Sequence, residues 1–324
     1  MSPALHLWLA AAALAIDFVI GDPPFLWRRV PHPVAIIGWA IGGADGLLNR
    51  PLLPFWLRRG LGIVAALVIV AVVAALGFAL ERWLAGFAWG WLVTVLMAAT
   101  LIAARSLYDH VAAVAAAFDD GLDAVRAAVA RIVGRDPASL DEPRIARAAI
   151  ESLAENFSDG VVAPVLWFAV LGLPGLFAYK AINTADSMIA HLNARHEAFG
   201  WAAARLDDLV NLPASRLSGA LIALAAPLAG GGTVTSLRVM FADARKHRSP
   251  NAGWPEAAMA AALGIALAGP RRYAGVIVAD PFVNEAGRLD AGPADIRRAL
   301  KVYVGANAAL LVLAVIVASL AVLL

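Results

Sequence analysis

Residues 61–80, LGIVAALVIVAVVAALGFAL, contain no charged residue and decide the fold class of this chain. About 20 apolar residues in a helix span the hydrocarbon core of a bilayer. Residues 86–104 and 302–324 are also free of charge, and residues 4–20 form a shorter apolar run that Asp17 interrupts. We therefore predict four full transmembrane helices, near 4–20, 61–80, 86–104 and 302–324.

The overall composition is that of an integral membrane protein. Apolar residues make up 61% of the chain and charged residues 15%, against about 25% charged residues in a soluble domain. The chain has no cysteine, which excludes disulfides, thiolate zinc sites and a cysteine nucleophile. The net charge of +2 gives no reason to expect nucleic acid as a partner.

The arginines between the first two predicted spans set the orientation in the membrane: Arg28, Arg29, Arg50, Arg58 and Arg59. The positive-inside rule places that loop, and then a helical region over 105–160, in the cytoplasm. Apolar segments in 161–300 are short or interrupted, as at residues 172–175 (GLPG) and at Pro227, which favours broken or re-entrant helices. Eight crossings is the alternative count. We predict one all-α, polytopic domain over 1–324 in the cell (inner) membrane.

The cytoplasmic region reads as two helices. Apolar residues recur at helical spacing from Tyr108 to Val133 and predict one continuous helix, for which Gly134 suits the C-cap and Asp136-Pro137 a stop. A second helix is expected to begin at residues 141–143, with Pro143 in its first turn. This second helix carries a row of charged residues.

In that row, Arg147, Glu151, Glu155 and Asp159 follow one another at steps of four and therefore share one helical face. Carboxylates at this spacing repel each other unless a cation neutralises them. The face is either a magnesium or substrate-amine site, or a solvated helix with an Arg147–Glu151 pair, and spacing alone does not separate the two. Asn156 adds a polar group at the edge of the next apolar segment and favours function.

Two further polar clusters interrupt apolar sequence: Lys180, Asn183, Thr184, Asp186 and Ser187, then Arg205, Asp207, Asp208 and Asn211. Polar groups beside apolar segments must be hydrogen-bonded or hydrated. The first cluster supplies either a phosphate-contacting lysine with a metal-binding Asn/Asp pair, or a helix-packing network. In the second, the adjacent aspartates point to different helical faces, so one can bind metal while the other caps the helix or pairs with arginine. A charged helix end is the alternative.

Residues 245–256 combine the basic run RKHR with the turn sequence SPNAGWPE. Ser249 and Asn251 lie in that turn, and a helix that starts there can hold phosphate at its N-terminus. On charge alone, the basic run is better explained as a cytoplasmic flank. Near the N-terminus, His32 between prolines is better explained as a rigid turn than as a ligand, whereas an acid inside a span, Asp17, usually faces a cavity or partner. No P-loop sequence occurs, so ATP phosphates would be held differently.

Together the motifs resemble the CbiB family (also called CobD), the membrane-bound adenosylcobinamide-phosphate synthases of cobalamin biosynthesis. The matching stretches are residues 21–23 (GDP), 32–34 (HPV), 132–136 (IVGRD), 148–164 (AAIESLAENFSDGVVAP), 181–188 (AINTADSM), 199–208 (FGWAAARLDD) and 249–259 (SPNAGWPEAAM). They follow the family's order over nearly the whole chain. One mild departure is Ala185, where a larger apolar residue is expected.

The resemblance implies an ATP- and magnesium-dependent ligase that joins adenosylcobyric acid to (R)-1-amino-2-propanol or its O-phosphate. The corrinoid, the amine and ATP would be substrates, and no tightly bound organic cofactor is expected. The active site would lie on the cytoplasmic face of the bilayer. A homo-oligomer and a complex with other cobalamin-pathway proteins both stay open.

The chemistry of this reaction, rather than the resemblance, suggests residue roles. We predict catalytic roles for Glu151, Glu155 and Asn156, substrate or phosphate binding by Lys180, Arg205, Ser249 and Asn251, and metal binding by Asp159, Asn183, Asp186, Asp207 and Asp208. Which carboxylate moves a proton and which binds metal stays open. The alternative functions are an AmpE-like, non-enzymatic signalling protein, which should lack much of the Glu-Asn-x-x-Asp-Gly pattern present here, and a transporter, which needs polar residues along a path across the bilayer.

Overall fold

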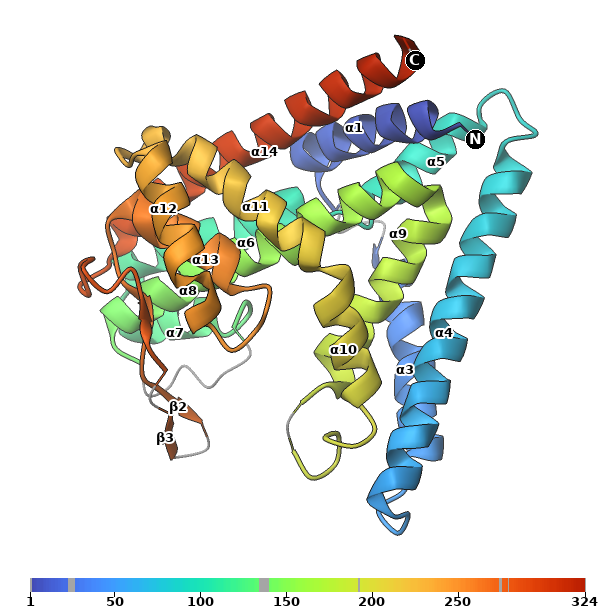
Figure 1. The fold of residues 1–324 in the computed structure, drawn as a ribbon, viewed down its shortest axis with the longest axis horizontal. Coiled ribbons are helices and arrows are strands. Elements are labelled where there is room, and N and C mark those ends of the chain that lie inside the picture. Colours follow the sequence, from blue (N-terminus) through green and yellow to red (C-terminus); the bar gives the residue numbers. More distant parts are fainter. Residues whose placement is uncertain are drawn as a thin grey trace. The chain divides into compact units, whose positions relative to one another are not determined.

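Helices dominate the computed structural model of this chain (Figure 1), and the all-α fold class is confirmed. The structure describes residues 2–22, 27–133, 140–191, 193–273, 276–278 and 280–323, so the predicted helix stop at 134–137 lies outside the described residues. The chain divides into two units. Unit 1 comprises Met1–Ala103, Ala163–Asn211 and Ala314–Leu324, and unit 2 comprises Ala104–Val162 and Leu212–Leu313.

Among the described residues, five helical segments are long and apolar enough to cross a membrane, one more than predicted. They are Phe55–Leu84, Gly90–Asp120, Glu142–Ile189, Leu212–Ala229 and Pro293–Leu323. Three of them overlap the predicted spans at 61–80, 86–104 and 302–324, whereas the predicted span at 4–20 coincides with one of the shorter apolar helices. The two additional long segments overlap the region expected to be broken, and both are interrupted: Glu142–Ile189 contains the π-turn Ser158–Val162 and a kink at Gly172, and Leu212–Ala229 ends in a 3-10 turn at Ala226–Ala229.

The helices of unit 1 pack around α4 and α9. They are α1 (Pro3–Ile20), α3 (Pro33–Leu48), α4 (Phe55–Leu84), α5 (Gly90–Ala99), α9 (Ala163–Ile189) and α10 (Trp201–Val210). In Figure 1, α4 runs beside α3, α9 and α10, and it contacts all three. A Cβ atom at Gly62 would overlap the carbonyl oxygen of Phe199, so glycine is what allows α4 to approach that backbone.

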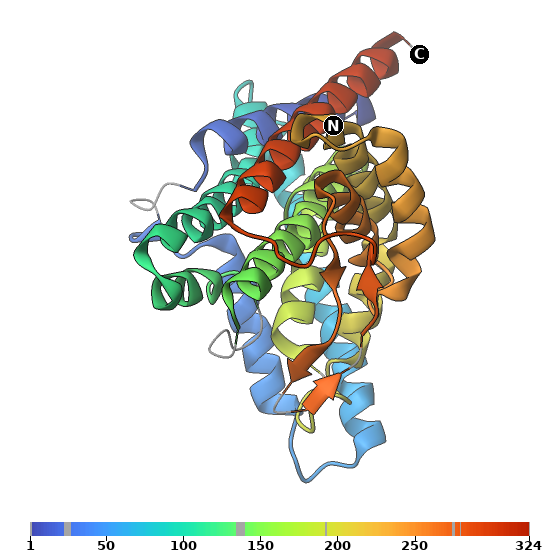
Figure 2. The same ribbon diagram turned by 90° about the vertical axis from the view of Figure 1, so that its left-hand side faces the viewer.

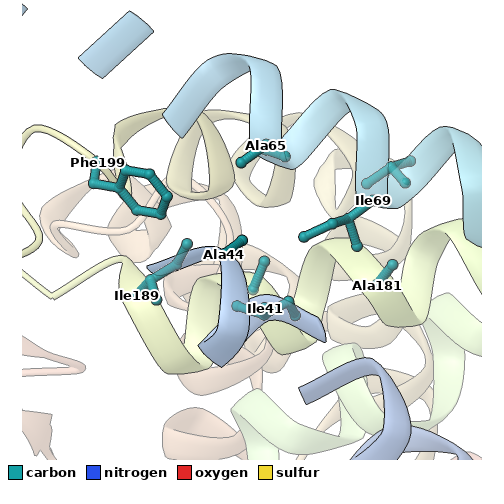
Figure 3. Close-up of a pocket in the computed structure, with 10 residues that line it drawn as sticks. Ile41, Ala44, Ala65, Ile69, Ala181, Ile189 and Phe199 are labelled. Atoms are coloured by element: carbon teal, nitrogen blue, oxygen red, sulfur yellow. The ribbon is translucent and has the colours of Figure 1, made fainter. Parts of the chain in front are cut away.

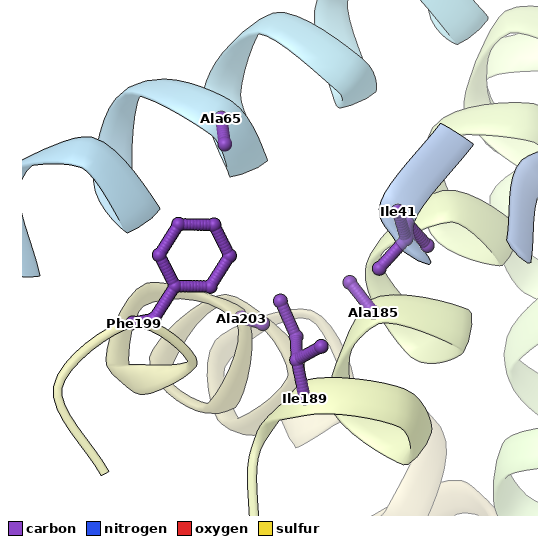
Figure 4. Packing of buried hydrophobic residues seen from close by; sticks show 6 residues of the cluster. All are labelled: Ile41, Ala65, Ala185, Ile189, Phe199 and Ala203. Atoms are coloured by element: carbon purple, nitrogen blue, oxygen red, sulfur yellow. The ribbon is translucent and has the colours of Figure 1, made fainter. Parts of the chain in front are cut away.

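Small and branched apolar side chains fill the space between these helices. Figure 4 shows the buried cluster, which consists of Ile41, Ala65, Ala185, Ile189, Phe199 and Ala203. Helices in lipid gain stability mainly from close van der Waals packing, which alanine favours because it lets backbones approach. Figure 3 shows a pocket beside the cluster, lined by Ile41, Ala44, Ala65, Ala66, Ile69, Val70, Ala181, Ala185, Ile189 and Phe199. This lining is apolar and offers no side chain for acid–base or metal chemistry.

Helix α9 is kinked where the sequence predicts a break. Gly172 has φ 70°, which glycine adopts without steric cost, and Pro174 follows it. Glu81 of α4 accepts the backbone N–H of Leu173 at 2.8 Å, and the same carboxylate lies 2.8 Å from the ring nitrogen of His6 on α1. The backbone donor at the kink is therefore satisfied inside the protein, as membrane segments require.

Unit 2 consists of shorter helices (Figure 2). They are α6 (Ala104–Ala117), η1 (Phe118–Asp120), α7 (Leu122–Val129), α8 (Glu142–Phe157), η3 (Ser158–Val162), α11 (Leu212–Ala225), η4 (Ala226–Ala229), α12 (Thr233–Asp243), η5 (Ala244–Lys246) and α13 (Gly253–Leu263), together with the part of α14 (Pro293–Leu323) up to Leu313. Nearly every residue of α13 is buried, and this helix packs against α8, α11 and α12. It is the central element of unit 2.

The prediction of one helix over 108–133 is wrong. The chain leaves the α-helical path after α6, passes through η1, and starts α7 after Gly121, which has φ 93°. That backbone conformation is left-handed and favours glycine, so Gly121 ends one helix and permits the turn into the next. The apolar residues keep helical spacing across the break, which is why their pattern does not reveal it.

Four short strands occur among the described residues of unit 2. They are β1 (Leu267–Ala268), β2 (Arg271–Tyr273), β3 (Val276–Val278) and β4 (Phe282–Val283). β1 pairs with β4 and β2 pairs with β3, both antiparallel. The β2–β3 hairpin extends away from the helices of its unit (Figures 1 and 2), whereas β1 lies against α8 and α13. β1 therefore faces the helix that carries the predicted catalytic acids.

Candidate functional site

Helix α8 carries the predicted catalytic acids and begins where the sequence places it. The Asp141 side chain caps the helix by accepting the backbone N–H of Arg144 at 3.0 Å, and Pro143 lies in the first turn. At Ser158 the α-helix passes into the π-helical turn η3. Single π-turns within α-helices are frequent at functional sites, and this one follows Glu151 and Glu155 and contains Asp159.

The carboxylates of the acidic face do not share one environment. Glu151 is 6% exposed, and its Oε1 accepts the backbone N–H of Ala268 on β1 at 2.8 Å. Glu155 is exposed, and Asp159 is half-buried within η3. Glu151 therefore fastens α8 to β1, while Glu155 and Asp159 are the acids that a solute can approach.

Asn156 is held in place by its own helix. Its Nδ2 donates to the carbonyl oxygen of Ser152 at 2.9 Å and to the Ser152 hydroxyl at 3.1 Å, and that hydroxyl donates to the carbonyl of Ile132 at 2.6 Å. One residue into the π-turn, the hydroxyl of Ser158 is buried and has no hydrogen-bond partner among the described residues. Near the start of η3, Ser152 and Asn156 are therefore held by hydrogen bonds, whereas the hydroxyl of Ser158 has no partner among the described residues.

A buried carboxylate is the centre of the polar residues in unit 1. Asp207 accepts the Nδ2 of Asn211 at 2.9 Å on one oxygen and the Nδ2 of Asn183 at 3.4 Å on the other. The hydroxyl of Tyr179 on α9 donates to Oδ1 of Asn211 at 3.0 Å and so extends this hydrogen-bond network. Burial raises the pKa of Asp207; the two amides offset part of this effect, and the charge of Asp208 adds to it. A fixed carboxylate with a raised pKa is suited to accept a proton.

The sequence-based prediction gives no role to Tyr179 or Asn211. Tyr179 precedes Asn183 by four residues on α9, and Asn211 follows Asp207 by four. Each therefore lies on the same helical face as a predicted site residue. The i,i+4 rule that picks out the acids of α8 also identifies these two partners.

Lys180 lies close to motifs from the N-terminal part of unit 1. It is 8% exposed and within electrostatic range of Asp22. Oδ1 of Asp22 lies 4.0 Å from Nε2 of His32, whose ring meets the ring of Trp27 edge-on with centroids 4.4 Å apart. Burial raises the pKa of Asp22, and His32, Trp27 and Lys180 each oppose that shift. Sequence reasoning links neither Asp22 nor His32 to the site, because about 150 residues separate them from Lys180.

The two adjacent aspartates of α10 have different partners. Asp208 pairs with Arg205 at 2.8 Å, and the arginine side chain is 62% exposed, so the pair contributes at most about 1 kcal/mol. Burial raises the pKa of Asp208 in spite of Arg205. Asp207, in contrast, is held by amides. Asp186, another predicted metal ligand, is half-buried on α9.

Ser249 and Asn251 shape the turn before α13. The hydroxyl of Ser249 accepts the backbone N–H groups of Asn251 and Ala252, each at 3.2 Å. Asn251 is 6% exposed, and its Oδ1 accepts from the Ser215 hydroxyl at 3.1 Å and from Nη1 of Arg216 at 2.8 Å. The fold thus brings Arg216 into contact with Asn251, one of the predicted phosphate-binding residues, and local sequence pattern does not reveal this contact.

The predicted site residues divide between the two units. Unit 2 holds Glu151, Glu155, Asn156, Asp159, Ser249 and Asn251, and unit 1 holds Lys180, Asn183, Asp186, Arg205, Asp207 and Asp208. Over the residues that the structure describes, no group of three or more His, Cys, Asp or Glu side chains is arranged to hold a metal ion. Among the predicted metal ligands, Nδ2 of Asn183 lies 3.4 Å from Oδ1 of Asp207. The assigned roles stay predictions.

Comparison with known proteins gives matches over almost the full chain. The family model described as CobD/Cbib protein matches residues 10–303. The chain is 52% identical to "Cobalamin biosynthesis protein CobD" of Sinorhizobium sp over 304 residues, which cover 93% of this chain and 94% of the relative. Proteins of the same name from Brucella suis and Rhodobacter capsulatus are 51% and 48% identical, over 92% and 91% of this chain and 93% and 92% of theirs. No solved structure matches.

Proposed function

The chain belongs to the CobD/Cbib protein family, and from this premise we propose that it acts in cobalamin biosynthesis as an adenosylcobinamide-phosphate synthase. It would join a carboxyl group of adenosylcobyric acid to the amine of (R)-1-amino-2-propanol or its O-phosphate. The observation that carries this proposal is the similarity to relatives named for cobalamin biosynthesis over more than nine-tenths of the chain.

The reaction requires activation, because a carboxylate is a poor acyl donor. In the proposed sequence, a carboxylate oxygen of the corrinoid attacks the γ-phosphorus of ATP, which forms an acyl phosphate and releases ADP. The amine nitrogen then attacks the acyl carbon, the C–N bond forms, and inorganic phosphate leaves with the electron pair of the C–O bond. A base must remove the proton of the ammonium group, since only the neutral amine is a nucleophile.

Asp207 is the base that we propose. Its two amide partners fix its orientation without neutralising its charge. Burial raises its pKa, which brings the carboxylate closer to the pKa of an amine and makes proton transfer less unfavourable. Metal binding, the role first predicted for Asp207, is the alternative, since each carboxylate oxygen keeps a further lone pair.

Glu155 and Asp159 are the carboxylates that we propose for the Mg²⁺ that accompanies ATP. Magnesium commonly binds through one or two protein carboxylates, completed by phosphate oxygens and water, and it neutralises the phosphate charge. Hard oxygen donors that are exposed or half-buried, one turn apart, fit that requirement. Asn183, Asp186 and Asp208 stay as further predicted ligands.

The proposal also includes the location and partners of the protein. Its long apolar helices indicate a multi-pass membrane protein. We infer that it lies in the cell (inner) membrane, with the active site on the cytoplasmic face, where ATP is available. Its partners would be the corrinoid, aminopropanol phosphate, ATP and the surrounding lipid.

The decisive test is ligation by the full-length protein in lipid nanodiscs. Adenosylcobyric acid, aminopropanol phosphate and Mg-ATP are supplied, and adenosylcobinamide phosphate and ADP are measured. We expect adenosylcobinamide phosphate and ADP in equal amounts, and formation of either product should require all of the substrates. Absence of product with every corrinoid form supplied would overturn the ligase assignment.

Substitutions in α8 separate catalysis from structure. Glu155→Gln should lower the ligation rate with little change in thermal stability, because this side chain is exposed. Glu151→Gln should lower stability, because it weakens the charge-assisted hydrogen bond to Ala268, which contributes about 1.5–3 kcal/mol. If folded Glu155→Gln ligates at the wild-type rate, the proposed role of this side chain is wrong.

A further inference from the structure

Arg216 on α11 is fixed by contacts that use one end of its guanidinium group. Its Nη1 donates to Oδ1 of Asn251 at 2.8 Å, to the Ser215 hydroxyl at 2.9 Å and to the carbonyl of Leu212 at 3.2 Å. The guanidinium carbon also lies 4.6 Å from the centroid of the Trp254 ring, a distance at which cation–π attraction holds the group over the ring. Both the position and the plane of the guanidinium are therefore set.

These contacts leave the other edge of Arg216 available. In the part of the chain that the structure describes, neither Nε nor Nη2 donates a hydrogen bond, and neither is among the polar atoms buried without a partner. The Nε–H and Nη2–H groups point in parallel, and this fork matches two oxygens of a phosphoryl or carboxyl group. Arg216 thus presents a preorganised bidentate donor on a half-buried side chain.

The charges around Arg216 favour an anion at this edge. In the basic run 245–248, Lys246 pairs with Asp243 at 2.7 Å, and Arg248 pairs with Asp280 at 2.7 Å. Arg245 has no carboxylate within ion-pair distance among the described residues, and it lies within electrostatic range of Arg216. Two arginines repel each other here, and an anion between them would relieve that repulsion.

Ser249 and Asn251, which were predicted to bind phosphate, shape the turn before α13 and orient Arg216. The Ser249 hydroxyl accepts two backbone N–H groups and shapes the start of α13. Asn251, almost fully buried, orients Arg216 through its Oδ1. The group that could hold a phosphate is then the arginine, and the turn before α13 positions it.

We propose that Arg216, with Arg245 beside it, binds the phosphoryl group of a substrate of the ligation reaction. This inference rests on the proposed function, which supplies two phosphate-bearing substrates: ATP and aminopropanol O-phosphate. The shared chemistry is a tetrahedral oxyanion with two or more negative oxygens. The two sources predict different kinetic effects.

The test is binding to purified full-length protein in nanodiscs, by calorimetry with ATP and with aminopropanol phosphate as separate probes. Arg216→Lys keeps the positive charge but loses the fork, so the Kd for one of the two probes should rise by about tenfold or more. Arg245→Gln should raise the same Kd by less. Lys246→Gln removes a cation of the same run that is paired with Asp243, and it should leave both Kd values within twofold of wild type.

Steady-state kinetics assigns the source of the phosphoryl group. If the site holds the amine's phosphate, Arg216→Lys raises the KM for aminopropanol phosphate but not for free aminopropanol. If it holds ATP, the KM for ATP rises with either amine. The inference is overturned if folded Arg216→Lys binds both probes with wild-type affinity. It stands if the variant loses affinity while wild-type protein yields no ligation product, and that pair of results would reject only the proposed function.

Discussion

Replacing Asn211 by alanine should move the acid limb of the pH–rate profile of the ligation reaction to higher pH. Nδ2 of Asn211 donates to Oδ2 of Asp207 at 2.9 Å, and such a bond favours the ionised carboxylate. Burial already raises the pKa of Asp207, and loss of this donor removes one of the two groups that oppose the shift. A larger fraction of Asp207 is then protonated at a given pH and cannot accept the proton of the amine.

The size of the shift follows from the hydrogen bond. A bond to a charged group contributes about 1.5–3 kcal/mol, and about 1.36 kcal/mol corresponds to one pH unit, so the limb should move by about one to two units. Asn183→Ala should move the limb in the same direction, because Asn183 also donates to Asp207 and opposes the effect of burial on the pKa of that carboxyl.

The assay is kcat/KM for ligation between pH 5 and 9 in nanodiscs, with thermal unfolding measured in parallel. Tyr179→Phe is the matched control, because it removes the hydroxyl that donates to Asn211 but leaves the donor to Asp207 in place. It should share part of the stability loss, which is about 1–3 kcal/mol for a buried acceptor left unsatisfied, without the pH shift. An unshifted limb in folded Asn211→Ala, or an equal shift in Tyr179→Phe, would refute Asp207 as the base.

Two further predictions concern the fold of unit 1. Gly62→Ala should lower the thermal unfolding midpoint by several degrees, because the added Cβ overlaps the carbonyl oxygen of Phe199. Gly60→Ala is the control: its Cβ meets no atom within 4 Å, so it should leave the midpoint unchanged or raise it. Equal midpoints for the two variants would contradict the packing argument. The pKa of Asp45 is lowered, because its hydrogen bonds to Asn49 and Arg195 together outweigh the opposing effect of burial. The contribution of Asp45 to the free energy of unfolding is therefore complete above the unfolded-state pKa, and it is lost as the pH falls through the lower folded-state pKa. Asp45→Asn should therefore be less stable than wild type at pH 7, and this difference should shrink on acidification, as measured by unfolding at each pH.

The apolar sequence was sufficient to predict the helical membrane fold, because 20 residues without charge have few alternatives to a spanning helix. It was not sufficient for the region after residue 105. There, the spacing of apolar residues is the same whether α6 continues or stops. The helix ends because Gly121 adopts φ 93°, and a single glycine within a helical pattern does not predict that backbone conformation.

For the site, spacing found the acids but not their environments. Glu151 and Glu155 are equivalent in a four-residue repeat, yet one is buried against the Ala268 backbone and the other is exposed. That difference depends on where β1 lies, more than 100 residues later in the chain. Arg216 was missed for the same reason, since its contact with Asn251 joins residues 35 positions apart.

The partners of a buried acid, rather than its burial, indicate what it can do. Asp45 and Asp207 each accept an asparagine amide from four residues later in the chain. Asp45 has in addition the guanidinium of Arg195, at 3.1 Å from its Nε, and its pKa is lowered; Asp207 has only a second amide, from Asn183, and its pKa is raised. A guanidinium neutralises a carboxylate and stabilises the fold, whereas amides orient it and leave its charge uncompensated. The second arrangement holds a carboxylate in a fixed orientation with a raised pKa, and this is the physical reason to look for the proton acceptor at Asp207.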